Sequence, residues 1–326
     1  MKCDFHVHTV FSDGVVWPTV RVDEALAEGL DAIAITEHVE WHRVEVIDDN
    51  RISYEIARDR AEGSDLVIIP GGEISASPDH FNALFLEDPN DRKLKDTIPA
   101  RRIAAANAHG GFVFWNHPGW TAKYKNGNTP VTEEFKNLLR DESVQGIEVC
   151  NGNGYWEGAL KLALEYDLAL LGNSDIHGVS YNRFEPGKHR TVTLVFAKEK
   201  SAEGIRDALL DKRTAIYQGD HLIGPVEFLK PLFFESLELE ATYREGTTIA
   251  YVSITNNSDI NFYCGNRSPF LFYNSTHFFT IKAHSTTILG VKVNKNLPEF
   301  ELDLVIHNLV VAPGESLELS LPVIMD

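Results

Sequence analysis

Cysteine is scarce in this chain of 326 residues. The three cysteines, Cys3, Cys150 and Cys264, are far apart and show no CxxC or paired spacing. This spacing does not predict a disulfide framework or a zinc site closed by thiolates. We expect all three to be reduced core residues, so they give no indication of an oxidising compartment.

Lysine and arginine are also few relative to aspartate and glutamate. Lys and Arg together number 30 against 48 Asp and Glu, which gives a formal net charge of −18. Nucleic-acid-binding surfaces use clustered Lys and Arg to neutralise phosphates, so this composition argues against such a surface. A small anionic substrate is still compatible with it, because bound cations reverse the local field.

The chain contains no apolar run of ~18 residues, so we do not expect any segment to span a membrane. No signal peptide precedes the first motif, which begins within three residues of Met1. A chain that starts at a signal-peptide cleavage site would look the same. The localisation is therefore open between the cytoplasm and export.

The first two thirds of the sequence alternate between short apolar runs and amphipathic patterns. Strands are expected at Lys2–His8, Asp31–Thr36, Leu66–Ile69, His80–Leu86, Gly111–Trp115, Gly146–Val149, Leu168–Leu171 and Thr191–Phe196. Helices are expected at Thr19–Gly29, Asn50–Glu62, Ile98–His109, Thr132–Arg140, Tyr155–Tyr166 and Ala202–Leu210. This alternation is typical of βαβ units with a largely parallel sheet, and it favours a closed or nearly closed barrel. The functional site of a barrel lies at the carboxyl ends of its strands.

Helical periodicity disappears after Gly224-Pro225. Strands are expected at residues 237–240, 248–254, 278–281, 288–293, 300–306 and 317–321, with turn-forming residues between them. Short strands at this spacing indicate an antiparallel sandwich or small barrel. We therefore predict an α/β domain at residues 1–224 and an all-β, sandwich-like domain at residues 225–326.

Imidazole and carboxylate side chains recur at the ends of the expected strands. In chain order the candidate metal ligands are His6, His8, Asp13, His38, Glu73, His80, His117, Asp175 and His177. Borderline and hard divalent ions prefer these ligand types. Without thiolates, the set suits a hydrolytic site better than a structural zinc site.

Two pairs of candidate ligands are spaced for one metal each. Residues i and i+2 of a strand project to the same side, so His6 and His8 can face the barrel mouth together, as can Asp175 and His177. An isolated His-x-His pair can equally be two core-edge imidazoles, but a second pair at another strand end argues against coincidence. Glu73 follows two glycines that allow a sharp turn, and it is the candidate for a carboxylate that bridges two cations. The alternative for Glu73 is a surface acid in a loop.

The remaining histidines differ in their positions. His38 and His117 close their strands, whereas His80 opens one and could instead be a structural histidine. His109 ends a helix before Gly110-Gly111, which indicates a capping role. Surface or core roles are expected for the other six: His42, His189, His221, His277, His284 and His307.

Taken together, these motifs resemble the PHP (polymerase and histidinol phosphatase) family of metal-dependent phosphoesterases. The matching segments are His6-Val7-His8-Thr9 with Ser12-Asp13-Gly14, Ile35-Thr36-Glu37-His38, Gly72-Glu73, His80, Asn116-His117-Pro118 and Ser174-Asp175-Ile176-His177. The resemblance covers roughly residues 2–220 and implies a distorted (β/α)7, TIM-like barrel. Glu37 departs from the family, which usually has Asp there; we expect it to orient a neighbouring ligand.

The resemblance also implies two or three divalent ions, of zinc, manganese or iron. By position, His6, His8, Glu73 and Asp175 would hold the first ion. Glu73, His80 and His117 would hold the second, and Asp13, His38 and His177 would hold a third. Two cations bridged by Glu73 would activate a water for attack on phosphorus. Glu73, Asp175 and His177 are thus the candidate catalytic residues, with either His177 or a metal-bound water as the proton donor to the leaving oxygen.

Substrate anchoring is expected from cations near the barrel mouth, because guanidinium groups match phosphate oxygens. The candidates Arg51, Arg183, Lys188 and Arg190 lie in segments that flank the site strands. The alternative for each is an ordinary solvated surface position.

The sequence therefore predicts a phosphoesterase that acts on a small phosphomonoester or nucleotide. One alternative is a metal-dependent amidohydrolase, a class that also begins with His-x-His but commonly bridges its metals with a carboxylated lysine. No lysine follows a strand suitably here. The other alternative is a binding or scaffold protein with a disused site, although retention of all the ligand types argues against disuse.

Overall fold

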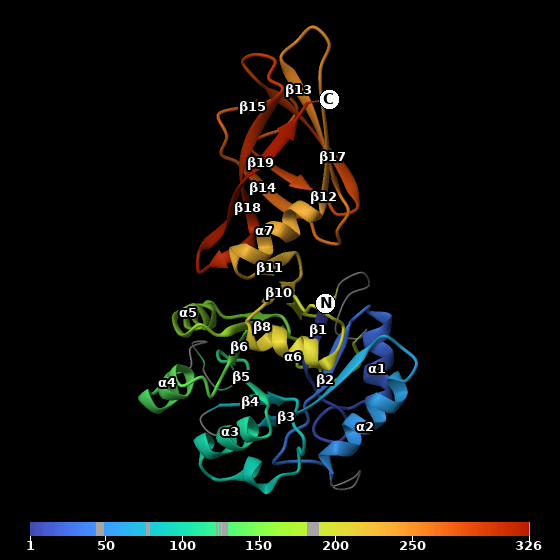
Figure 1. Cartoon of the computed structure of the whole chain (residues 1–326), viewed down its shortest axis with the longest axis vertical. Helices are drawn as coiled ribbons and strands as arrows, with labels where there is room; N and C mark the ends of the chain where they lie inside the picture. The colour runs from blue at the N-terminus through green and yellow to red at the C-terminus, as the bar shows by residue number, and fades with distance from the viewer. Residues whose placement is uncertain are drawn as a thin grey trace. The chain divides into compact units, whose positions relative to one another are not determined.

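The chain folds into two compact units in a computed structural model (Figure 1). The structure describes residues 1–43, 49–75, 79–121, 123, 125, 130–180 and 189–325. The first unit comprises Met1–Gly219 and the second Asp220–Asp326. The sequence placed this division at Gly224-Pro225. The structural division comes earlier because the strand His221–Ile223 pairs with a strand of the second unit.

The first unit is a mixed α/β structure in which helices lie around the strands (Figure 1). Its strands are β1 (Lys2–Val7), β2 (Ala32–Ile35), β3 (Val67–Ile74), β4 (Phe81–Leu84), β5 (Phe112–Trp115), β6 (Gly146–Asn151), β7 (Gly154–Tyr155), β8 (Ala169–Asn173), β9 (Val192–Val195) and β10 (Thr214–Gln218). Its α-helices are α1 (Pro18–Ala27), α2 (Asn50–Ala61), α3 (Pro99–Ala108), α4 (Glu133–Arg140), α5 (Glu157–Tyr166) and α6 (Ala202–Leu210).

The strands follow the order β10-β9-β1-β2-β3-β4-β5-β6, with β8 also paired to β6. The β1–β2, β2–β3, β5–β6 and β6–β8 pairs are parallel, but β4 runs antiparallel to both β3 and β5. A parallel pair needs a crossover of about a dozen residues, and the segment between Ile74 and Phe81 is too short for one. The expectation of a largely parallel sheet therefore needs correction at β4, and also at β9 and β10, which pair antiparallel.

The reversal of β4 has a consequence for His80. Because β4 runs against its neighbours, its first residues lie at the same edge as the carboxyl ends of β3 and β5. His80 directly precedes β4, and the backbone N–H of Asn116 donates to its carbonyl at 3.0 Å. A histidine that opens a strand thus reaches the same edge as the histidines that close strands.

Strand β8, at one end of this strand order, approaches β1, which lies in the interior of the order. An isolated parallel bridge joins Val7 to Ile176, and the Phe5 N–H donates to Asn173 Oδ1 at 2.9 Å. Among the described residues, the strand ladders themselves do not form a complete ring. The seven-stranded distorted barrel is therefore still a prediction.

The core of the first unit lies between the strands and helix α6. Phe5, Ile69, Phe112 and Leu171 from four strands pack with Leu209 of α6, and all five are fully buried. Cys3 belongs to the same cluster, and Cys150 and Cys264 are also buried and unpaired. Burial raises the pKa of all three thiols, which fits the expectation that they are reduced core residues.

The second unit contains two mainly antiparallel sheets and one helix. Its elements are β11 (His221–Ile223), α7 (Val226–Glu235), β12 (Leu237–Tyr243), β13 (Ile249–Asn256), β14 (Phe262–Asn266), β15 (Leu271–Phe272), β16 (Phe278–Ile281), β17 (Ser285–Lys292), β18 (Glu299–Ala312) and β19 (Glu315–Ile324). One sheet has the order β12-β13-β17-β15; in the other, β16-β14-β18 continues to β19. Burial alternates along β13 and β19, as expected when each sheet covers one face of a shared core.

Helix α7 was not expected from the sequence. Pro225 precedes it and Pro231 lies inside it, and a proline in a helix interior normally predicts a break. Leu229 and Phe233 form its buried face, and the Phe233 ring contacts Phe262 of β14 at 4.9 Å. Packing within the second unit thus holds a helix that its own sequence disfavours.

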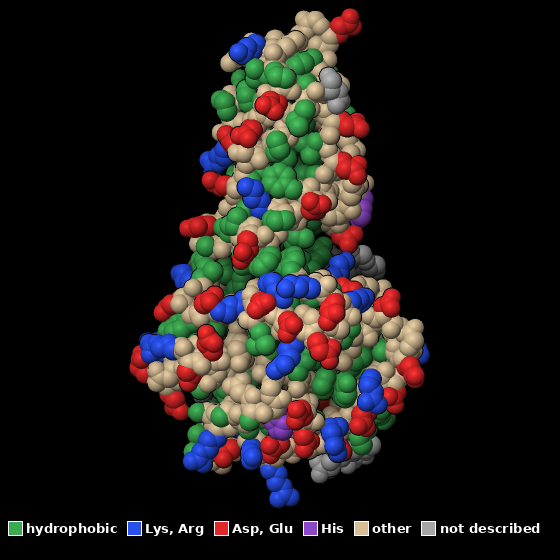
Figure 2. Space-filling model, in the orientation of Figure 1, with side chains coloured by type: hydrophobic (Ala, Val, Ile, Leu, Met, Phe, Trp, Pro, Cys, Tyr) green, Lys and Arg blue, Asp and Glu red, His purple; other side chains and the backbone are tan. Residues whose placement is uncertain are grey.

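Charges of both signs are mixed on the visible face of the first unit (Figure 2). Lys and Arg side chains lie among Asp and Glu there, and this view shows no separate basic patch. No helix in the described part of the chain is long and apolar enough to cross a bilayer.

Candidate metal centre

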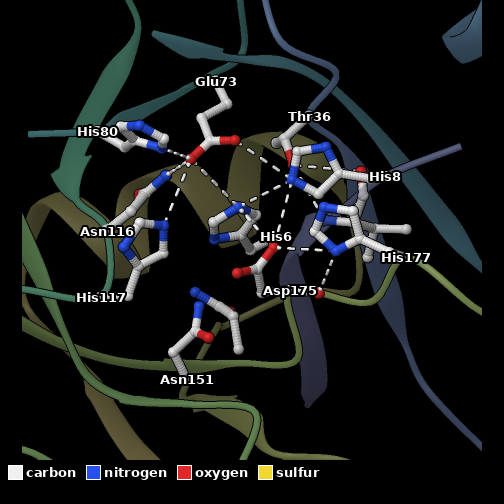
Figure 3. Close-up of polar contacts among 12 residues, drawn as sticks. His6, His8, Thr36, Glu73, His80, Asn116, His117, Asn151, Asp175 and His177 are labelled. Atoms are coloured by element: carbon white, nitrogen blue, oxygen red, sulfur yellow. Dashed lines mark hydrogen bonds and ion pairs between the residues drawn. The ribbon is translucent and has the colours of Figure 1, made fainter. Parts of the chain in front are cut away.

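All nine candidate ligands lie together in one cluster. Figure 3 labels all of them except Asp13 and His38. They come from β1, from the loop after it, and from the ends of β2, β3, β5 and β8 or the residues that follow them. His80 joins them from the start of β4. Each imidazole has a ring nitrogen within 3.6 Å of a carboxylate oxygen in the cluster, and each carboxylate has an oxygen within 3.6 Å of an imidazole nitrogen. The sequence predicted this set residue by residue, and the fold gathers it at one edge of the sheet.

The carboxylate of Glu73 occupies the middle of the cluster and is almost completely buried. Five imidazole nitrogens surround its two oxygens. Oε1 faces His80 Nδ1 at 2.9 Å, His6 Nε2 at 3.6 Å and His117 Nε2 at 3.6 Å, whereas Oε2 faces His38 Nδ1 at 3.1 Å and His8 Nε2 at 3.3 Å. Each oxygen therefore faces a different group of histidines, which is the arrangement a bridging carboxylate requires.

Two aspartates connect the other side of the cluster. Asp13 lies 3.0 Å from His177 Nε2, 3.3 Å from His38 Nε2 and 3.3 Å from His8 Nδ1. Asp175 Oδ1 lies 3.3 Å from His6 Nε2 and 3.4 Å from His8 Nε2. His8 is thus shared between the Glu73 side and the aspartate side.

Close backbone packing positions Glu73. A Cβ added to Gly72 would lie only 2.7 Å from Val39 Cγ1, so a larger residue would push β3 away from the segment after β2. The two segments exchange hydrogen bonds at this point: the Val39 N–H donates to the Glu73 carbonyl, and the Glu73 N–H donates to the Glu37 carbonyl, both at 2.9 Å. The glycine before Glu73 therefore brings that carboxylate directly beside His38.

Two candidate ligands have an unusual backbone conformation. Asp175 has φ +51° and His117 has φ +28°, both in the left-handed region that non-glycine residues rarely adopt. Such conformations cost about 1–3 kcal/mol each and are found where the surrounding structure enforces them, often at functional sites. Here they turn both side chains toward Glu73 and His6 (Figure 3).

The sequence analysis missed one buried carboxylate, Glu148 of β6. It accepts hydrogen bonds from the Asn173 and Asn151 side-chain amides and from the His117 backbone N–H, and it lies 3.0 Å from His6 Nδ1. A carboxylate on the far nitrogen of a histidine fixes the ring and makes its other nitrogen a better ligand. The available signal was a lone acid in the otherwise apolar run at residues 146–150 of β6.

Glu37 has a comparable supporting position. Its buried carboxylate accepts hydrogen bonds from the Thr9 and Ser12 hydroxyl groups. The Ser12 hydroxyl in turn lies 3.3 Å from His8 Nδ1. The longer acid therefore still orients the loop that carries Asp13, as the sequence led us to expect.

Two fully buried arginines brace the backbone that carries the ligands. Arg21 of α1 donates to the carbonyls of His8 at 2.8 Å, Ile176 at 3.0 Å and Gly178 at 2.6 Å. Arg190 pairs with Asp4 at 3.1 Å and with Glu28 at 2.8 Å. Since its guanidinium is completely buried, Arg190 is not at the mouth as the sequence analysis suggested, and we do not carry it forward as a substrate contact.

The other suggested substrate contacts receive no support from the described residues. Arg51 is exposed at the start of α2, where it pairs with Asp49 at 3.5 Å. Arg183 and Lys188 lie outside the described residues. His109, expected to be structural, is the C-terminal cap residue of α3 and pairs with Asp91 at 3.1 Å.

The electrostatics of the cluster favour positive charge within it. Burial opposes protonation of His8, but hydrogen bonds to Asp175 and Glu73 outweigh burial and raise its pKa to about 10. Burial likewise opposes protonation of His6, yet the Asp175, Glu148 and Glu73 carboxylates raise its pKa well above its ordinary value. The pKa values of Glu73, Asp175 and Asp13 are lowered against burial by the surrounding histidines.

Divalent ions fit this arrangement. Five groups of three side chains have ligand atoms within 4.8 Å of one another: His6/His8/Glu73, His6/His117/Asp175, His8/Asp13/His38, His8/Asp175/His177 and Glu73/His80/His117. All of their donors are nitrogen or carboxylate oxygen. Metal ions would compete with protons for the same imidazoles, so metal affinity should fall as the pH is lowered.

Several known proteins are similar to this chain. A two-domain protein from Bacteroides vulgatus, containing a predicted PHP-like metal-dependent phosphoesterase, is 37% identical with a TM-score of 0.91; the match covers 99% of this chain and 95% of that one. An uncharacterized protein of Methanocaldococcus jannaschii is 26% identical over 188 residues, which is 54% of this chain and 82% of that protein. A lesion-specific endonuclease from Pyrococcus furiosus is 14% identical with a TM-score of 0.47, covering 69% of this chain and 58% of that one.

The second unit has a match of its own. The sequence profile of a family described as an Ig-like domain matches residues 237–322, which span β12 to most of β19. The C-terminal β-domain, which the sequence analysis could not assign, thus matches a family. The 37% identity to the Bacteroides vulgatus protein extends over 99% of this chain and therefore covers both units. The chain belongs to the PHP-like metal-dependent phosphoesterases, in a two-domain form with a C-terminal Ig-like domain.

Proposed function

We propose that this protein hydrolyses a small phosphate ester at a site that holds two or three divalent ions. The observation that supports the proposal best is the position of Glu73, whose two oxygens face separate groups of histidines. Bound divalent ions would supply a water of near-neutral pKa and would neutralise negative charge on the phosphoryl oxygens.

The side chains of the cluster divide into three ligand sets, of which the first two share Glu73 and the third adjoins the first at His8. We assign His6, His8, Glu73 and Asp175 to the first ion, because His6 Nε2 lies 3.1 Å from His8 Nε2 and both nitrogens lie beside Asp175 Oδ1, although His6 faces the same Glu73 oxygen as the second set. Glu73, His80 and His117 are assigned to the second. Asp13, His38 and His177 are assigned to a third, with Asp13 within 3.3 Å of both imidazoles. Glu148 lies beside His6 Nδ1 and orients that ring. Glu37 accepts from the Ser12 hydroxyl, which lies beside His8 Nδ1, and so positions His8 and the loop after it.

With two ions bound, His177 is the proposed proton donor to the leaving oxygen; with a third ion bound, its Nε2 would be a ligand and a water molecule would donate the proton instead. Its side chain is 36% exposed, whereas those of His6 and His8 are fully buried, so His177 can exchange protons with solvent. Its Nδ1 lies 2.8 Å from the Asp175 carbonyl, which favours a proton on Nδ1 and orients Nε2 toward Asp13.

The proposal predicts metal-dependent release of inorganic phosphate. Metal-depleted protein, reloaded separately with Mn²⁺, Zn²⁺ or Fe²⁺, should release phosphate from a panel of phosphomonoesters and lose this activity again on chelation. A parallel panel of phosphodiesters would show whether diesters are also cleaved, and a panel of amides tests the amidohydrolase alternative. Hydrolysis of amides without any phosphate release would contradict the proposal.

A further inference from the structure

Trp120 has an exposed indole next to the metal centre. Its side chain is 45% exposed, although tryptophan has more apolar surface to bury than any other residue. The indole centroid lies 5.5 Å from the His117 ring and 6.1 Å from the His80 ring. Both histidines face the same oxygen of Glu73, so the indole borders the part of the cluster assigned to the second ion.

The face of this indole is not covered by the neighbouring imidazoles. The ring planes are inclined by 57° to His117 and by 51° to His80, so neither imidazole lies flat on the indole. The His80 side chain is 25% exposed, so part of this imidazole is accessible beside the indole.

Backbone hydrogen bonds on both sides of Trp120 hold it in this position. The backbone N–H of Trp120 donates to the His117 carbonyl at 2.9 Å, and the backbone carbonyl of Trp120 accepts from the backbone N–H of Lys123 at 3.0 Å. The Lys123 ammonium donates to Asp79 at 3.1 Å, and Asp79 also accepts from the Trp115 indole N–H at 3.0 Å. Trp120 is therefore connected through Lys123 and Asp79 to Trp115, on the strand that precedes His117.

The distribution of tryptophan in the chain supports a role in binding. Three of the five tryptophans have strongly exposed side chains: Trp17 (51%), Trp41 (49%) and Trp120 (45%). Each follows a candidate ligand by three or four residues, namely Asp13, His38 and His117. Of the three, Trp120 is the one whose ring contacts candidate ligands among the described residues, and exposed apolar surface beside a polar site is typical of ligand-binding positions.

We propose that Trp120 is a specificity-determining residue that stacks against a ring in the organic group of the phosphate ester. This inference rests on the proposed function, because the phosphate must bind at the Glu73 cluster for the ring to reach the indole. Stacking would remove apolar surface of both rings from water, whereas an ester without a ring would leave the indole exposed. The substrate class is thus a ring-bearing phosphate ester, with either a planar base or a sugar as the ring.

Binding of two phosphonates to the Mn²⁺-loaded protein tests the inference without catalysis. Phenylphosphonate carries a ring and methylphosphonate does not, and neither is hydrolysed at its C–P bond. Calorimetry should show that Trp120→Ala weakens phenylphosphonate binding by about 10-fold or more, the effect of losing one aromatic stacking partner. Methylphosphonate affinity and metal content should not change, and Trp120→Phe should keep most of the preference.

Leu164→Ala is the matched control, because Leu164 is an equally exposed apolar residue (50%) on helix α5 and should affect neither ligand. Equal loss of both phosphonates in Trp120→Ala, or loss of metal, would show that the indole only shields the histidines and would overturn the inference. So would equal affinity of the wild-type protein for the two phosphonates.

Hydrolysis assays identify the ring and separate this inference from the proposed function. Adenosine 5′-phosphate and glucose 6-phosphate represent the two kinds of ring, and glycerol 2-phosphate has none. Trp120→Ala should lower kcat/KM for at least one ring-bearing ester and leave glycerol 2-phosphate unchanged. Ring-selective phosphonate binding without phosphate release from any ester would support the inference while contradicting the proposed function.

Discussion

Glu73→Gln should lower phosphate release by at least about 10²–10³-fold, the loss expected when a charge-stabilising group is removed from an active site. An amide keeps the shape of the carboxylate but lacks its charge, so it cannot hold two cations between its oxygens. Elemental analysis of the purified variant should find at least one ion fewer than in the wild-type protein. Steady-state kinetics with saturating Mn²⁺ would measure the loss of turnover.

Glu148→Gln is the matched control for that variant. Both carboxylates are buried in the same site, but Glu148 reaches the cluster only through His6 Nδ1 and the His117 backbone. Its loss should cost about 10–100-fold in metal affinity or activity, as is usual for a residue that orients a ligand. If Glu148→Gln proved more damaging than Glu73→Gln, the bridging role of Glu73 would be untenable.

The second large effect concerns stability. Arg190→Met should destabilise the first unit by about 3–5 kcal/mol, the cost of leaving buried carboxylates without their partner. Asp4 is completely buried beside Arg190, and Glu28 is largely buried. At about 2–4 °C per kcal/mol for a unit of this size, Tm should fall by roughly 6–20 °C. Thermal unfolding of the metal-free protein, followed by circular dichroism, would measure it.

Arg58→Met is the control for this measurement. Arg58 also pairs with a carboxylate, Asp59 at 2.9 Å, but both side chains are more than half exposed. Exposed pairs contribute about 0–1 kcal/mol, so this variant should unfold close to the wild-type temperature. Equal shifts in the two variants would mean that the buried network around Arg190 has no special role in stability.

The candidate ligands could be predicted from the sequence because their chemistry is local. His6 and His8 alternate on one strand, and Asp175 and His177 have the same spacing on another segment. Parallel strands bring their carboxyl ends to one edge whatever the details of packing. His80 was ambiguous because it opens a strand, and only the antiparallel direction of β4 places it with the others.

The residues that support the ligands could not be found in the same way. Arg21, Arg190 and Glu148 are charged residues whose partners lie far away in the sequence, such as Gly178 for Arg21 and His6 for Glu148. Only the fold shows that these charges are buried and paired. Arg190 illustrates the error that results, because an arginine beside a site strand suggested substrate binding where the structure has a buried ion pair.

Helix α7 was missed for a different reason. Local propensity favours no helix across Pro231, although Leu229 and Phe233 have the i, i+4 spacing of a helix face. Contacts with β14 of the second unit supply the stabilisation that the local sequence lacks. The strands β14 and β15 were also unexpected, because each is short and lies among turn-forming residues.

Anomalous diffraction from crystals of the Mn²⁺- or Zn²⁺-loaded protein would test the central claim most directly. The account predicts two or three metal peaks per chain, with two of them on either side of the Glu73 carboxylate and a third, if present, between Asp13, His38 and His177. The absence of any peak beside Glu73 in metal-saturated crystals would contradict it.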